Sequence, residues 1–397
     1  MVDVQHAPAE LSNRTQDARE PRQLFERPNL SPWVEPETTK SVSDWAELET
    51  IDLTLLDSQD PDVRATLLKQ TKKALSVDGF MLVTGLGVSP ATIARQLAIA
   101  QHLTTGTPRE VKERFTAKMS AGSYRGYKLQ GIWNKEGGVP DNIEHYNFES
   151  ESFAHTASQH PETTAPFIPE IEAFAKYTYH HIIRRILTLI SLTLELEPDA
   201  LWKLHDHRSP IGAACQRYMR YTPRDKAEEE ATSGIWSKGH TDYNTVSLLF
   251  SQPVTALQIL TPENDWKWVK HVPGGAVVNV ADALEFLSGG VLKATRHRVI
   301  RPPDDQAGLV RYVLIHFARA KLDVRLDPIW ESPVVKREGK HAFQSRIDSG
   351  EPAPTQGEWL EERIRRTGKE QYDEKKNPTG SGLVRENILG RTVEYYV

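Results

Sequence analysis

Two histidines and one carboxylate in this chain have the types and spacing of a mononuclear metal site. His240 and Asp242 stand in the sequence Gly-His-Thr-Asp-Tyr-Asn, and His297 follows later in Arg-His-Arg-Val. Two neutral imidazoles and one carboxylate can hold Fe(II) on one face and leave the opposite positions open for a co-substrate and O2. We therefore predict that His240, Asp242 and His297 bind iron and form the catalytic centre.

An arginine in an apolar run adds a second chemical feature. Arg311 lies within residues 309–317, where most of its neighbours are apolar. A cation buried in such a strand costs free energy unless it is paired. One reading is a structural ion pair with a nearby Asp or Glu. The other is a clamp for the distal carboxylate of a 2-oxo acid, which together with the iron ligands predicts an Fe(II)/2-oxoglutarate-dependent oxygenase.

Short β-rich runs, separated by Gly, Pro, Asn and Asp clusters, must position these residues. The runs are residues 213–221, 245–250, 256–261, 266–270, 276–280, 294–301 and 309–319. Many short strands at regular spacing indicate an antiparallel sandwich or a jelly roll, whose open mouth can hold a metal and a small ligand. His240 and Asp242 stand just before one run. Because alternate residues of a strand share a face, both side chains can point into one cavity.

The first half of the chain has a different, mainly helical pattern. Helical spacing or capping predicts helices over residues 61–77, 90–103 and 169–197, with a buried strand at 80–83, and residues 118–168 form a loop-rich region. We divide the chain into a flexible arm (1–44), a helical and loop-rich region (45–205), an oxygenase core (206–330) and a C-terminal extension (331–397). Within that extension we expect a polar helix over 357–375, outside the barrel and with a solvated face.

The bulk properties narrow the class of protein. The chain has 397 residues, a net charge of −5 and no long basic block, so nucleic-acid binding has no electrostatic support. The single cysteine, Cys215, fits a reducing compartment. Residues 1–44 contain no apolar run of signal-peptide length, and no stretch approaches the roughly 20 apolar residues of a membrane helix. We expect a cytoplasmic enzyme with a small-molecule substrate, no membrane partner, and a monomeric or homodimeric state.

A second histidine cluster serves as a comparison for the metal site. His205-Asp206-His207 also has metal-like spacing, but it follows a helix and precedes Ser209-Pro210. No downstream ligand matches it. We therefore do not expect this cluster to bind a metal.

Beyond these residues, the sequence resembles the isopenicillin N synthase-like branch of the Fe(II)/2-oxoglutarate oxygenases. That branch includes plant flavonoid and gibberellin oxidases and many fungal biosynthetic enzymes. The resemblance runs from about Ile51 to Ala320. The stretches that carry it are Asp78-Gly79-Phe80, Gly126-Tyr127, Arg220-Tyr221-Thr222-Pro223, Gly239 to Tyr243, Leu257-Gln258-Ile259, Trp268-Val269, Pro273 to Asp282, His297-Arg298-Val299 and Arg311-Tyr312.

The resemblance implies a mainly β fold with flanking helices around a double-stranded β-helix (jelly roll) core. It implies that His240, Asp242 and His297 bind iron, and that Arg311 and Tyr221 bind the 2-oxoglutarate carboxylate. Tyr146, Phe148 and Phe317 match positions that face the organic substrate in flavonoid-type members, although each is also compatible with an ordinary core aromatic. The chain departs from the family in one place, because Val313 replaces the serine that usually follows Arg-x.

The function expected from these residues is that of a dioxygenase requiring Fe(II), 2-oxoglutarate and O2. It would hydroxylate or desaturate a small ring-containing metabolite, such as a flavonoid, terpenoid, alkaloid or polyketide, and release succinate and CO2. Three alternatives stay open. They are an iron oxidase of the same fold that uses no 2-oxoglutarate, a catalytically silent metal-binding sensor, and a zinc or manganese hydrolase or isomerase in a cupin-like barrel.

Overall fold

The computed structural model describes residues 27–133, 138–153, 159–366 and 383–396. Most of the predicted arm, at residues 1–26, and the second part of the predicted 357–375 helix lie outside the described residues. Among the residues described, no helix is both long enough and apolar enough to cross a bilayer.

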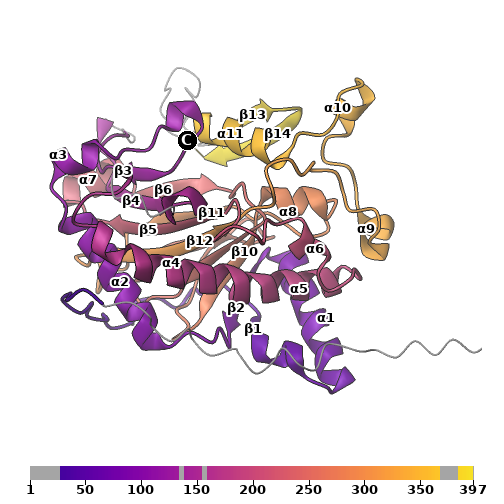
Figure 1. Cartoon of the computed structure of the whole chain (residues 1–397), viewed down its shortest axis with the longest axis horizontal. Helices are drawn as coiled ribbons and strands as arrows, with labels where there is room; N and C mark the ends of the chain where they lie inside the picture. Colours follow the sequence, from indigo (N-terminus) through magenta and orange to yellow (C-terminus); the bar gives the residue numbers. More distant parts are fainter. Residues whose placement is uncertain (1–26, 134–137, 154–158, 367–382, 397) are drawn as a thin grey trace, which may run out of the picture.

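Two β-sheets form the centre of the molecule (Figure 1). The larger has the strand order β1 (Thr50–Asp52), β2 (Phe80–Thr84), β10 (Ala276–Val280), β7 (Val246–Phe250), β12 (Arg311–Ala318), β5 (Cys215–Tyr221), β4 (Ile143–Phe148) and β3 (Gly126–Lys128). The smaller has the order β6 (Ile235–His240), β11 (His297–Ile300), β8 (Leu257–Leu260) and β9 (Trp266–Trp268). Only the β1–β2 pair is parallel within this described set.

From β5 to β12 the chain passes repeatedly between the two sheets. Strands β5, β7, β10 and β12 lie in the larger sheet, whereas β6, β8, β9 and β11 lie in the smaller one. Each of the seven predicted runs contains a strand. The sequence reading missed β6, because Ser237, Lys238 and Gly239 interrupt its apolar pattern.

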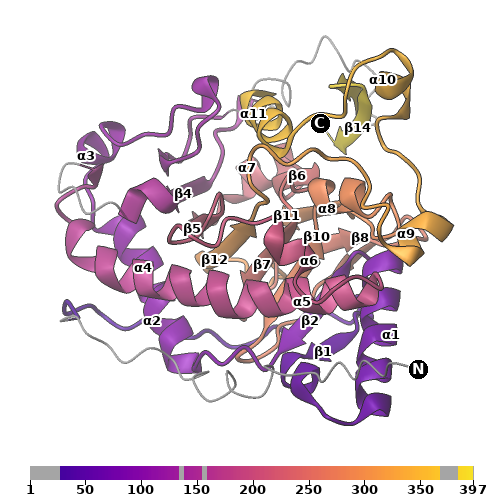
Figure 2. The same cartoon turned by 45° about the vertical axis from the view of Figure 1, so that its right-hand side comes forward.

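Helices cover the outer face of the larger sheet, as Figure 2 shows for α4 and α5. The α-helices of the described residues, on this face and elsewhere, are α1 (Pro61–Val77), α2 (Pro90–Thr105), α3 (Arg109–Glu113), α4 (Ile168–Tyr177), α5 (Arg184–Thr193), α6 (Ala200–Lys203), α7 (Lys226–Ala231), α8 (Asp282–Leu287), α9 (Pro333–Glu338), α10 (Gln344–Asp348) and α11 (Gln356–Arg366). The predicted 61–77 and 90–103 helices correspond to α1 and α2. The predicted 169–197 helix contains a π-helical segment, Thr178–Ile183, which joins α4 to α5 without ending the helix.

The two faces of the larger sheet have separate roles, because side chains alternate along a strand. Even-numbered residues of the central strands pack in the main core against the helices, among them Tyr218, Leu248, Val278 and Leu314. Odd-numbered residues of the same strands point toward the smaller sheet. This alternation separates the side chains of the larger sheet that face the helices from those that face the smaller sheet.

The C-terminal elements lie against one end of the sheets. Helix α11 and the hairpin of β13 (Leu383–Ile388) and β14 (Arg391–Tyr396) gather there in Figure 1, in yellow. Helix α11 is not simply a solvated helix as predicted, since Trp359, Leu360, Arg363 and Ile364 are buried. The helix is strongly charged. Its narrow apolar stripe, which packs against the rest of the protein, was therefore not recognised in the sequence.

His205 gives the fold a predictable dependence on pH. Its imidazole is buried, with Nδ1 2.8 Å from the Leu201 carbonyl oxygen and Nε2 2.9 Å from Thr245 Oγ1. Burial lowers the pKa of His205 to about 4. The unfolded chain therefore binds this proton more readily, and stability is lost as the pH falls from about 6.5 toward 4.

We expect His205 to remove about 2 kcal/mol of unfolding free energy between pH 7 and pH 5. Urea unfolding at the two pH values should show this loss in the wild type and a correspondingly smaller loss in His205→Gln. Equal losses in the two proteins would contradict the assignment.

Candidate active site

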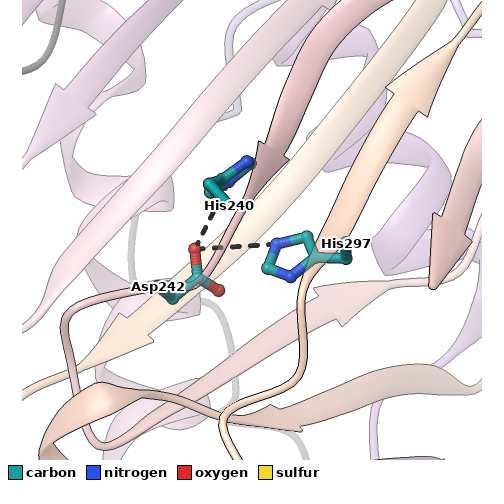
Figure 3. Close-up of side chains that lie close together, drawn as sticks. All are labelled: His240, Asp242 and His297. Carbon is teal, nitrogen blue, oxygen red and sulfur yellow. Dashed lines mark ion pairs between the residues drawn. The ribbon is translucent and has the colours of Figure 1, made fainter. Parts of the chain in front are cut away.

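The three predicted metal ligands come together at the ends of two paired strands (Figure 3). His240 ends β6, His297 begins β11, and the two residues are direct partners in the sheet. One oxygen of Asp242, Oδ1, lies 3.8 Å from Nε2 of each histidine. The possible ligand atoms of the three residues all lie within 4.8 Å of one another. His240 thus ends a strand of the smaller sheet, β6, that was not among the runs predicted from the sequence.

Hydrogen bonds orient all three groups toward one point. Nδ1 of His240 lies 2.8 Å from the Lys238 carbonyl oxygen, and Nδ1 of His297 lies 3.2 Å from that of Thr295. These carbonyls accept the Nδ1 protons, so each Nε2 keeps its lone pair for a metal.

The electrostatics of the site also fit a divalent cation. Burial lowers the pKa of His240 to about 4. Burial alone would raise the pKa of Asp242, but His297, His240 and hydrogen-bond donors outweigh it and lower that pKa. Neutral imidazole beside an ionised carboxylate is the state that a divalent cation requires.

Asp242 has its second oxygen fixed by two donors that the sequence reading missed. Ser247 Oγ donates to Asp242 Oδ2 at 2.6 Å, and Asn279 Nδ2 donates at 3.0 Å. Oδ1 is therefore the oxygen that faces the histidines. The sequence feature that could have identified Ser247 and Asn279 is that each is a polar residue in an otherwise apolar strand, β7 or β10.

Removing these donors should weaken iron binding. Partners of this kind typically contribute 10- to 100-fold in metal affinity, so we expect roughly that loss for Asn279→Ala and for Ser247→Ala. Fe(II) titration against a competing chelator measures it. Ser251→Ala is the matched control, because Ser251 contacts His271 and lies outside the ligand cluster. Wild-type affinity in Asn279→Ala and Ser247→Ala would rule out this role.

Arg311 begins β12 and is 4% exposed. Its Nε donates to the Val254 carbonyl oxygen at 3.3 Å, and its guanidinium lies 5.4 Å from the ring centre of Tyr221, its partner across the sheet. Burial lowers the pKa of Arg311. No ion pair joins it to an acidic side chain within the described residues. The described residues therefore give no support to a structural ion pair at Arg311.

A cavity of about 210 Å³ contains both Arg311 and the three ligands. It is lined by odd-numbered residues of the larger sheet, including Tyr221, Val313 and Phe317. Val313 is buried two residues after Arg311 on the same face, so the position of the usual serine hydroxyl is apolar here.

Tyr146 and Phe148 do not line this cavity. They are even-numbered residues of β4 and lie in the helix-side core, where Tyr146 Oη is 2.8 Å from His160 Nδ1 and the Phe148 ring stacks with Phe153. The assignment of these two residues to the substrate is thus corrected. The 118–168 region was read as loops, which hid the alternation that places His145, between them, on the cavity face.

Helix α11 contributes part of the cavity wall and contacts the metal-ligand loop. Arg363 and Leu360 line the cavity. Arg363 Nη1 pairs with Asp282 Oδ2 at 3.0 Å, and Nη2 donates to the Thr241 carbonyl oxygen at 3.1 Å. The backbone N–H of Asp282 in turn donates to the Asp242 carbonyl oxygen at 2.9 Å. Helix α11 is therefore linked to the backbone around Asp242 in two ways, directly at Thr241 and through Asp282 at Asp242 itself.

Comparison with known proteins supports the same class. A model of the 2OG-Fe(II) oxygenase superfamily matches residues 213–320, and a model of the non-haem dioxygenase in morphine synthesis N-terminal region matches residues 48–170. A 2-oxoglutarate-dependent dioxygenase of Didymella fabae is 26% identical, covering 75% of this chain and 86% of the relative. A leucoanthocyanidin dioxygenase of Perilla frutescens is 28% identical, covering 64% and 68% respectively.

Solved structures show the same fold at low sequence identity. A full-length Neurospora crassa protein in complex with alpha-KG has 18% identity and a TM-score of 0.68, covering 83% of this chain and 99% of that one. JOX2 in complex with 2OG, Fe and JA has 21% identity and a TM-score of 0.59, covering 82% and 91%. From the matched family models and relatives we conclude that the chain belongs to the Fe(II)/2-oxoglutarate-dependent oxygenase superfamily, in its isopenicillin N synthase-like branch.

Proposed function

We propose that this dioxygenase binds Fe(II) through His240, Asp242 and His297, and binds 2-oxoglutarate through Arg311 and Tyr221. It hydroxylates or desaturates a small ring-containing metabolite, of the flavonoid, terpenoid, alkaloid or polyketide kind. The relative named leucoanthocyanidin dioxygenase supports this substrate class. We also propose that β5 to β12 form a double-stranded β-helix, because their order alternates between the two sheets.

The observation that carries the co-substrate assignment is the charge of Arg311. A buried guanidinium with no acidic partner in the described residues is costly, and a bound carboxylate removes that cost. The same cavity holds the three metal ligands, so an anion at Arg311 can extend toward them.

The iron, the co-substrate and the cavity residues have separate roles in the proposed reaction. Iron with 2-oxoglutarate and O2 supplies the oxidising power, and succinate and CO2 are released. Arg311 holds the distal carboxylate, and Tyr221, whose pKa is raised by burial, keeps its phenolic proton as a donor. Apolar side chains on the cavity wall, including Leu249, Ile315 and Phe317, exclude water and limit how the substrate can lie.

Anaerobic titration of the Fe(II)-loaded protein with 2-oxoglutarate tests the proposal. A weak visible charge-transfer band should appear in the wild type and be absent in His297→Ala. Succinate release can then be used to search for the substrate. A protein that binds stoichiometric iron and gives no band would contradict the 2-oxoglutarate site and favour an oxidase that takes its electrons from the substrate.

A substitution at Val313 tests whether 2-oxoglutarate binding can be strengthened. Restoring a hydroxyl beside Arg311 with Val313→Ser should tighten 2-oxoglutarate binding by about 2- to 10-fold, since one hydrogen bond typically contributes about 0.5–1.5 kcal/mol. The charge-transfer titration measures the dissociation constant, and Val313→Ala controls for the loss of side-chain volume. Equal affinities in Val313→Ser and Val313→Ala would show that the hydroxyl does not reach the ligand.

A further inference from the structure

His145 is a buried polar side chain whose hydrogen-bonding capacity is unused. It lies on the cavity face of β4 and is 2% exposed. Neither Nδ1 nor Nε2 has a hydrogen-bond partner among the described residues. Leaving a buried polar group unsatisfied costs about 1–3 kcal/mol, so the position needs an explanation.

Arg217 lines the same cavity from the neighbouring strand, β5. Its Nε donates to Asn147 Oδ1 at 2.8 Å, and its guanidinium lies 4.9 Å from the ring centre of Phe317 and 5.4 Å from that of Tyr124. Within the described chain it forms no ion pair with an acidic side chain. It is close enough to His145 that its charge adds to burial in lowering the pKa of that imidazole.

Two other arginines of the cavity differ from Arg217 in this respect. Arg319 pairs with Glu149 at 3.2 Å, and Arg363 pairs with Asp282 at 3.0 Å. Arg217 shares the lack of an acidic partner with Arg311, the proposed 2-oxoglutarate anchor. The cavity therefore holds two cations whose charge no described acidic side chain balances.

These two cations lie near opposite ends of β12. Arg217 contacts Phe317, which is six residues from Arg311, or roughly 20 Å along an extended strand. Phe317 pairs with Ser247, which hydrogen-bonds the metal ligand Asp242. A ligand at Arg217 thus lies in the cavity that contains the metal ligands, near the end of β12 that pairs with Ser247, and too far from Arg311 to share its anion.

We propose that His145 and Arg217 form a subsite for the carboxylate of the organic substrate, with Phe317 and Tyr124 against the adjoining ring. The substrate class is then a ring-containing monocarboxylic acid, which narrows the proposed function and rests on it. The sequence showed no charged patch that would indicate an acidic substrate, because the two residues are far apart in the chain and the strand of His145 was read as a loop.

The chemistry of the pair fits a carboxylate. A guanidinium can donate two parallel hydrogen bonds to its oxygens, and its flat face can remain stacked on an aromatic ring. A neutral imidazole donates one further hydrogen bond and keeps one acceptor nitrogen, which suits a hydroxyl next to the carboxylate. One ligand group therefore satisfies both the uncompensated charge of Arg217 and the unused hydrogen-bonding capacity of His145.

Matched acids and amides test the subsite. The full chain, loaded with Fe(II) and saturating 2-oxoglutarate without O2, is titrated with 2-naphthoate, cinnamate and indole-3-acetate and with the carboxamide of each. Binding is followed by perturbation of the charge-transfer band and by calorimetry. We expect at least one acid to bind at least tenfold more tightly than its amide, and Arg217→Gln to abolish that difference.

The controls separate this proposal from the proposed function. Arg298→Gln is the matched control, because Arg298 also stacks on an aromatic ring, that of Trp266, and donates to a side-chain amide, that of Gln258, but does not line the cavity. It should keep the acid preference. A normal 2-oxoglutarate band in Arg217→Gln and in His145→Leu would show that both variants are folded.

The outcomes then have distinct meanings. Absence of the band in the wild type would overturn the proposed function itself. A normal band with no acid preferred over its amide would overturn only the carboxylate subsite, as would an acid preference that survives both Arg217→Gln and His145→Leu.

Discussion

Replacing Arg311 with alanine is expected to raise the dissociation constant for 2-oxoglutarate by about 100-fold. Truncating one partner of a buried, hydrogen-bonded charge pair costs about 2–5 kcal/mol, and about 3 kcal/mol corresponds to that factor. Arg311 is 4% exposed, and Arg217, the other cavity cation without an acidic partner in the described residues, is too far away to take over the carboxylate. The anaerobic charge-transfer titration measures the constant directly.

Two further measurements make the Arg311 result specific. Fe(II) affinity should be unchanged in Arg311→Ala, because the three ligands and the donors to Asp242 are intact. Arg311→Lys should recover part of the affinity, since it keeps the charge and loses the two-pronged geometry. If Arg311→Ala bound 2-oxoglutarate as the wild type does, the anchor would have to be elsewhere in the cavity.

The second large effect is on stability. Asp282→Ala should lower the free energy of unfolding by about 3–5 kcal/mol, because it removes the buried carboxylate that forms an ion pair with Arg363. Both side chains are almost fully buried, and Trp359 Nε1 also donates to Asp282 Oδ2, at 3.1 Å. Urea unfolding of the wild type and of Asp282→Ala measures the difference.

A double variant distinguishes the ion pair from simple loss of packing. Asp282→Leu with Arg363→Met replaces both charges by apolar groups and should recover most of the stability lost in Asp282→Ala. A double variant as unstable as the sum of the single changes would mean that packing around Trp359, rather than the uncompensated charge, dominates.

The grouping of His240, Asp242 and His297, and the place of Arg311 in the same cavity, could be predicted from the sequence because few residue types can do the chemistry proposed for them. The sequence indicates this chemistry through a His-x-Asp pair, a later histidine and an arginine in an apolar strand. These residues indicate it even though the strand that ends at His240 was not predicted. The strands from β7 to β12 were recognisable because short β-rich runs alternate there with clusters of Gly, Pro, Asn and Asp.

Other parts of the site depend on tertiary contacts that local pattern does not encode. The residues of β4 look irregular because polar side chains such as His145 face a cavity and not a packed core. The assignment of Tyr146 and Phe148 to the substrate was therefore shifted by one residue along β4. Because neighbouring residues of a strand point to opposite faces, this shift placed them on the cavity face instead of the core face. Helix α11 was misjudged because its charged Arg363 is neutralised by Asp282, which is distant in sequence.

The origin of the cavity wall has an evolutionary consequence. The metal ligands and Arg311 belong to β6, β11, β12 and the loop after β6, whereas Leu360 and Ile388 belong to α11 and β13, near the end of the chain. Mutations of Leu360 and Ile388 can reshape the space offered to a substrate while the proposed iron and 2-oxoglutarate positions are retained, provided that Arg363 of α11 keeps its contacts with Thr241 and Asp282. After gene duplication, such a protein could acquire a new substrate by drift in its last elements, with the oxidative chemistry inherited intact.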